Sequence, residues 1–155
     1  MKKAFKYLCF VLIIAVFTLF DSVFFKNIRL TLSLLISFSL YVKSDKAVYI
    51  FSLSGFLCDV ISKTLPSFSF LYLYISLGCV WCEKILLNIS GKTVFLISFL
   101  GFLLFYFSMH IINMLTFFDV TTGFSFLFES VSRAIFNSLL SFVFYYVLKG
   151  VKFED

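Results

Sequence analysis

Residues 93–118 read TVFLISFLGFLLFYFSMHIINMLTFF, a stretch without lysine, arginine, aspartate or glutamate. A transmembrane helix needs about 20 predominantly apolar residues, so this stretch is long enough to cross a bilayer. The whole 155-residue chain has the same character, since 62% of its residues are hydrophobic and only 14% are charged. A chain this small exposes much of its surface, so the excess Phe, Leu and Ile must face lipid. The sequence therefore predicts an all-α integral membrane protein.

Charged and turn residues divide the chain into about six predicted membrane spans, which form one transmembrane domain over residues 1–155. The breaks fall where charge, Pro, Gly and Asn cluster between apolar runs. The second span is the shortest, so it either recruits flanking residues while Lys26 and Arg29 snorkel to the headgroups, or it is re-entrant. The predicted spans cover residues 4–25, 28–42, 47–65, 68–89, 93–118 and 124–148.

The distribution of basic residues predicts the orientation of these spans. With six spans and the amino terminus inside, nine of the thirteen basic residues lie on the cytoplasmic side, as the positive-inside rule requires. Both termini are therefore predicted to be cytoplasmic, with Pro66 at an outer turn. The net charge of +5 reflects this topology and contact with anionic lipid. Nothing in the sequence predicts a nucleic-acid partner.

One short segment occurs twice. Leu35-Ile36-Ser37-Phe38 recurs as Leu96-Ile97-Ser98-Phe99. In a chain built from so few residue types, chance explains such a recurrence better than two homologous halves. We therefore predict no internal repeat.

The segment Cys79-Val80-Trp81-Cys82 has the CxxC spacing used in redox exchange and, when doubled, in zinc binding. No second pair and no nearby histidine completes a metal site. Residues three apart on a membrane helix merely share a face, so we interpret the two cysteines as packing residues. A membrane redox enzyme is the weaker alternative.

Catalytic motifs are scarce. His110 is the only histidine in the chain. A Ser/His/Asp triad or a Cys/His dyad, each of which needs a histidine, would therefore have to use this one residue. The sequence also lacks a glycine-rich phosphate loop of the Walker type. We therefore expect a protein that is not an enzyme and that carries no cofactor and no metal.

Two acid–base pairs lie inside the predicted spans, where ionisable groups are costly and usually face a bundle interior or a partner. In each pair the acid precedes the base by four residues, so the two side chains share a helix face. Under the predicted topology both pairs, together with a histidine and an asparagine, lie in the outer half of the membrane. Either each pair satisfies itself near the headgroups, or these groups converge on one outer polar patch. The residues are Asp59, Lys63, His110, Asn113, Glu129 and Arg133.

Gly55 precedes Asp59 by four residues, so both occupy one face of the third predicted span. A glycine in a membrane helix permits close approach of a neighbouring backbone. We hypothesise that another helix approaches this face, while Asp59 and Lys63 fix its register through a charge-assisted contact at the outer rim.

The stretch FSLSGFLCDVIS at residues 51–62 resembles the signature of the bacterial rod shape-determining protein MreD family. In that signature a glycine-phenylalanine pair, here Gly55-Phe56, precedes an aspartate, here Asp59, at the end of a membrane helix. The resemblance continues along the chain. A short leucine-rich span (30–40) precedes the signature, and an aromatic and leucine-rich helix (68–77) follows it.

This resemblance implies a non-enzymatic, multi-pass subunit of the cell-elongation machinery in the bacterial cytoplasmic membrane. Such a subunit works beside the bitopic protein MreC and, through it, with the actin-like MreB, the glycosyltransferase RodA and a penicillin-binding transpeptidase. It acts as a scaffold for peptidoglycan synthesis. Candidate partner-contact or packing residues are then Gly55, Phe56, Asp59 and Lys63.

The alternative function is the substrate-binding membrane subunit of an energy-coupling-factor transporter, which is similar in size, span number and fold. Those subunits often carry an Ala-x-x-x-Ala motif on the first helix, and Ala4 and Ala15 do not give that spacing. They also tend to have a longer polar outer loop that closes over the ligand, whereas this chain offers only short loops. The sequence thus favours the scaffold over the transporter.

Overall fold

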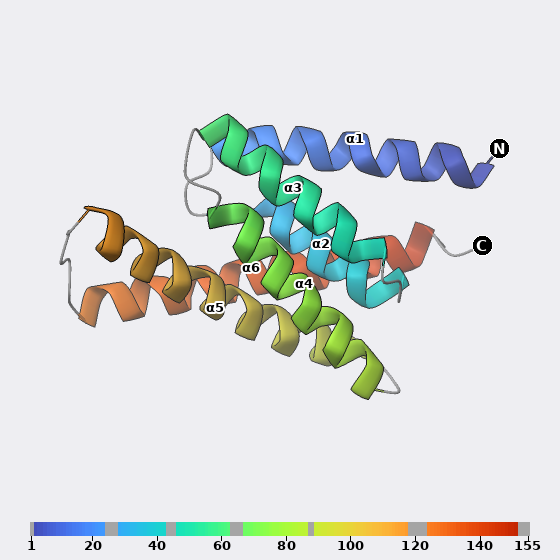
Figure 1. The fold of residues 1–155 in the computed structure, drawn as a ribbon. Coiled ribbons are helices and arrows are strands. Elements are labelled where there is room, and N and C mark those ends of the chain that lie inside the picture. Colours follow the sequence, from blue (N-terminus) through green and yellow to red (C-terminus); the bar gives the residue numbers. More distant parts are fainter. Residues whose placement is uncertain are drawn as a thin grey trace.

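The computed structural model describes residues 2–23, 28–42, 46–62, 67–86, 89–117 and 124–151, and these ranges form a bundle of six helices. The predicted all-α fold is confirmed. Successive helices run in alternating directions, so the start of α1 and the end of α6 lie at the same end of the bundle (Figure 1). The helices are α1 (Lys2–Val23), α2 (Leu30–Val42), α3 (Lys46–Ser62), α4 (Ser67–Ile85), α5 (Gly91–Phe117) and α6 (Phe124–Val151).

The two ends of the bundle are named here by the helices that begin there. The even end is where α2, α4 and α6 begin, at Leu30, Ser67 and Phe124. The odd end is where α1, α3 and α5 begin. Among the described residues, the candidate polar residues Asp59, His110, Asn113, Glu129 and Arg133 lie in the halves of their helices nearest the even end.

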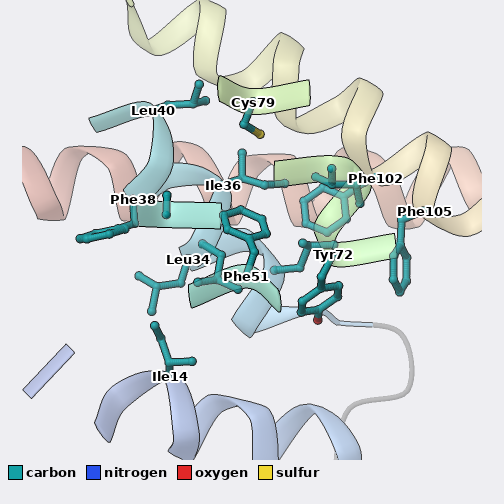
Figure 2. Close-up of a cluster of buried hydrophobic side chains, with 14 of the residues drawn as sticks. Ile14, Leu34, Ile36, Phe38, Leu40, Phe51, Tyr72, Cys79, Phe102 and Phe105 are labelled. Carbon is teal, nitrogen blue, oxygen red and sulfur yellow. The ribbon is translucent and has the colours of Figure 1, made fainter. Parts of the chain in front are cut away.

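Helix α2 forms the centre of the bundle. Every residue from 31 to 40 is buried, and α2 contacts each of the other five helices. The rings of Phe10 on α1 and Phe38 on α2 stack with their centroids 4.0 Å apart. Figure 2 shows the side chains of α2 among those of its neighbours, with Leu34, Ile36, Phe38 and Leu40 near Ile14, Phe51, Tyr72 and Phe102.

The enclosure of α2 explains how the shortest predicted span can be a helix. A helix that is apolar on all sides is stable where it is buried on all sides. At 13 residues, α2 is about 20 Å long, which is less than the ~30 Å thickness of a bilayer core. Because the surroundings of α2 are protein, lipid does not set its length.

The bundle has an apolar core and, unlike a water-soluble protein, also an apolar surface. Large apolar side chains face outward on every long helix; Phe70, Trp81, Leu115 and Phe128 are 67–75% exposed. Serine side chains, in contrast, are buried at helix contacts, as membrane helices use small residues to pack closely. The buried serines are Ser33, Ser37, Ser39, Ser54, Ser76, Ser98, Ser130, Ser138 and Ser141.

Within the described residues, three helices are long and apolar enough to cross a membrane. These stretches are Ser67–Ile85, Gly91–Leu115 and Phe126–Gly150. The other three helices supply shorter apolar stretches, namely Cys9–Asp21, Leu30–Tyr41 and Ala47–Ile61.

Candidate functional site

Asp59 caps the beginning of α4. Its Oδ1 accepts a hydrogen bond from the Phe68 backbone N–H at 2.9 Å, and its Oδ2 accepts one from the Ser69 N–H at 2.8 Å. The Ser69 hydroxyl also donates to Oδ2. A carboxylate is favourable here because the first N–H groups of a helix lack partners and carry partial positive charge. The Asp59 side chain, only 5% exposed, is therefore directed at α4 of its own chain.

This arrangement revises the hypothesis that Asp59 holds a partner at an outer rim. The carboxylate holds α3 and α4 together, and Lys63, with which a pair was predicted, lies outside the described residues. Phe56, the neighbour of Gly55, is 57% exposed and faces away from the bundle. Of the candidate contact residues that the structure describes, Phe56 is thus the one whose side chain is open to the surroundings.

Gly55 lies where α3 and α4 come closest together. A Cβ atom at this position would stand 2.8 Å from the Phe68 carbonyl oxygen and 2.9 Å from the Ser69 Cα. Both are backbone atoms, so neither can move aside without shifting α4. The close approach inferred from the sequence is made by α4 of the same chain.

Asp21 at the end of α1 repeats this capping arrangement at the start of α2. Its Oδ1 accepts from the Leu30 N–H and its Oδ2 from the Thr31 N–H, both at 2.9 Å. Each aspartate therefore caps a helix through residues nine and ten positions later in the chain. We predicted no internal repeat and gave Asp21 no role. The signal in the sequence is an aspartate followed at that spacing by an apolar and then a hydroxyl residue.

The guanidinium of Arg29 lies inside the even end of the bundle. Its Cζ is 5.1 Å from the ring centroid of Phe68 on α4 and 5.5 Å from that of Phe105 on α5. A cation over an aromatic face is attracted by the ring quadrupole. The Nε atom is buried without a hydrogen-bond partner. From the sequence, Arg29 was expected to snorkel toward the headgroups, and its contacts with Phe68 on α4 and Phe105 on α5 were not predicted.

Helices α2 and α6 pack along a polar seam. The Ser33 hydroxyl donates to the Asn137 carbonyl at 3.1 Å, and the Ser37 hydroxyl donates to the Ser141 carbonyl at 2.6 Å. Asn137 also accepts from the Arg29 backbone N–H. Such small polar residues let two helix backbones come close. The serine spacing of four residues, repeated on α6 as Asn137 and Ser141, is the sequence signal for this seam.

Tyr106 joins α5 to the same seam. The Asn137 Nδ2 donates to the Tyr106 hydroxyl oxygen at 2.8 Å and to the Arg133 carbonyl at 2.8 Å. A single buried amide therefore ties together α2, α5 and α6. Because unpaired buried polar groups are costly, the bonds of Asn137 fix how these helices fit together.

The predicted outer polar patch is only partly assembled. Arg133 and Glu129 form an ion pair on α6, as their spacing predicted. The His110 ring stacks on Phe126 with centroids 3.7 Å apart, and Asn113 is exposed. In the described helices, no polar contact connects Asp59 with these four residues. Asp59 is engaged by the backbone of α4, and Lys63 of the first pair lies outside the described residues.

An apolar groove of about 400 Å³ runs between α4 and α5. Its wall includes the CxxC cysteines, which are free thiols; Cys79 is buried and Cys82 is half-buried. Gly78 also lines the groove, and a Cβ atom there would meet no other atom within 4 Å. The groove is bordered by exposed apolar side chains, chiefly Trp81, Leu100 and Leu104.

Comparisons with known proteins add no identification, because no family model, curated protein or solved structure matches this chain. The resemblance to the MreD family therefore rests on the residues quoted from the sequence. Among the described residues, no group of three or more His, Cys, Asp or Glu side chains is placed to hold a metal ion.

Proposed function

We propose that this protein is a non-enzymatic, multi-pass subunit of the bacterial cytoplasmic membrane that scaffolds the cell-elongation machinery by binding the membrane helix of an MreC-like bitopic protein. The observation that carries the proposal is the apolar α4–α5 groove with Gly78 in its wall. The resemblance to the MreD family supplies the identity of the partner.

The proposed membrane location is supported by the outward-facing apolar side chains and the buried serines. In this proposal all six helices cross the bilayer, with α2 enclosed by the others. The even end then faces outward and both termini face the cytoplasm, in keeping with the lysine distribution along the sequence.

The groove is proposed to hold a helix because of the glycine in its wall. A glycine in a helix interior is about 1 kcal/mol less favourable than alanine. At Gly55 this cost is offset by the close approach of α4, whereas no atom of the described residues lies within 4 Å of a Cβ at Gly78. A partner helix packed against Gly78 would gain from the missing side chain, as small residues in membrane helices allow backbones to come close.

A scaffold role is also supported by how the polar groups of the bundle are used. Asp21 and Asp59 cap helices, and Asn137 ties three helices together. The two aspartates and Asn137 thus serve to hold helices together. Their engagement with backbone groups favours a structural role.

The test is co-purification of the MreC-like protein in mild detergent with two matched variants. Gly78→Leu fills the groove, and Gly150→Leu makes the same change near the end of α6, where a Cβ atom also meets nothing within 4 Å. We expect Gly78→Leu to lose the partner and the rescue of rod shape, and Gly150→Leu to keep both. If Gly78→Leu retains the partner at normal expression, the partner helix does not bind in the α4–α5 groove. A vitamin bound to the purified protein, without the partner, would favour the transporter instead.

A further inference from the structure

Arg29 differs from an ordinary structural arginine in what surrounds it. Its backbone is held by Asn137 on α6, and its side chain lies beside the rings of Phe68 and Phe105. Asp21 on α1 is close enough to interact with it electrostatically. Arg29 is thus a cation whose position is fixed by four helices at the even end of the bundle.

The hydrogen-bond donors of this guanidinium are not matched by acceptors within the described chain. A guanidinium carries five N–H donors and no acceptor. Aromatic rings attract its charge but offer no lone pairs in the plane of the fork. The Nε is buried without a partner, and the Arg29 side chain donates no hydrogen bond to a described residue.

Three carboxylates of the described residues lie toward this end of the bundle: Glu129 pairs with Arg133, and the two aspartates are engaged by backbone groups. Both oxygens of Asp21 accept from the backbone of α2, and both oxygens of Asp59 accept from α4. Each aspartate thereby offsets the positive end of a helix. An oxyanion from outside the chain could therefore accept hydrogen bonds from the Arg29 guanidinium and neutralise its charge.

We propose that the Arg29 guanidinium binds a phosphate group, carried by a membrane phospholipid whose headgroup lies at the even end. A planar guanidinium pairs with phosphate through two parallel hydrogen bonds, a geometry that lysine cannot reproduce. Phospholipid headgroups are the phosphate source at the depth where α2 begins. The buried rings of Phe68 and Phe105 lie beside the guanidinium and attract its charge. This inference depends on the proposed membrane location and is independent of the partner protein.

The test is native mass spectrometry of the delipidated protein mixed with phosphatidylglycerol or with diacylglycerol, which lacks the phosphate. Wild-type protein should retain phosphatidylglycerol and not diacylglycerol. Arg29→Gln should lower the retained lipid by about tenfold, the effect of losing one charge-assisted contact. Arg133→Gln is the matched control, because that guanidinium is paired with Glu129, and it should retain lipid as the wild type does.

Two further arms keep the proposal falsifiable. Arg29→Lys keeps the charge without the fork and should bind less lipid than wild type but more than Arg29→Gln, which covers the case in which Arg29→Gln fails to fold. Inorganic phosphate alone should not raise the thermal stability of the lipid-free protein. If it does, and Arg29→Gln abolishes the rise, then the site binds free phosphate, and the proposal of a lipid phosphate is wrong. Equal lipid retention by Arg29→Gln and Arg133→Gln would overturn the site itself.

Discussion

Replacing Gly55 by alanine adds one methyl group at the closest point between α3 and α4. The new Cβ would stand 2.8 Å from the Phe68 carbonyl oxygen, so α4 must move away. Overpacking of this kind costs about 1–3 kcal/mol, and displacing α4 weakens the Asp59 cap by about 1 kcal/mol more. The higher helix propensity of alanine relative to glycine offsets about 1 kcal/mol of this loss in stability. We therefore expect Gly55→Ala to lower the free energy of unfolding by about 1–3 kcal/mol.

Gly78→Ala is the matched control, since its propensity gain is the same and its Cβ meets nothing within 4 Å. It should raise the free energy of unfolding by up to about 1 kcal/mol. Both variants are to be measured by reversible unfolding in mixed detergent micelles. The propensity terms cancel in the difference between the variants, which should be about 2–4 kcal/mol. Equal stability of the two proteins would refute the close α3–α4 approach.

Three further predictions concern the cap, the topology and the cysteines. Asp59→Asn replaces one acceptor oxygen of the cap by a donor, so it should lower the free energy of unfolding by about 1–2 kcal/mol; an unchanged unfolding curve would argue against the cap. Cysteines introduced singly at Ser44 and Ser67 should be labelled from opposite sides of the membrane, and labelling from one side would exclude the six-span topology. Replacing both Cys79 and Cys82 by alanine should leave rod-shape rescue intact; loss of rescue at normal protein level would revive a redox role.

The helices themselves could be predicted well from the sequence, because apolar stretches bounded by charge dictate them. The predicted span 93–118 corresponds to α5, Gly91–Phe117, and the span 68–89 corresponds to α4, Ser67–Ile85. The helix α4 ends at Ile85, four residues before the predicted end of the span. Such boundaries follow from local composition, which a single sequence contains.

The polar contacts were much harder to predict, because they depend on how helices far apart in the chain come together. Arg29 was expected only to snorkel toward the headgroups. Its contacts with the aromatic rings of Phe68 on α4 and Phe105 on α5 were not predicted. Asp59 was assigned a partner four residues away, yet it binds backbone groups nine and ten residues away. These contacts depend on how α3 and α4 lie relative to each other, which no helical periodicity encodes.

The central claim is that the α4–α5 groove holds the membrane helix of an MreC-like protein. The most direct measurement is photocrosslinking in living cells from a photoreactive amino acid placed at Trp81, which is 67% exposed beside the groove. Val147 on α6 is the control position, since it is 56% exposed and similarly near the odd end of the bundle. We predict a crosslink to the MreC-like protein from position 81 and none from position 147. Absence of the crosslink at position 81, or equal crosslinking from both positions, would contradict the account.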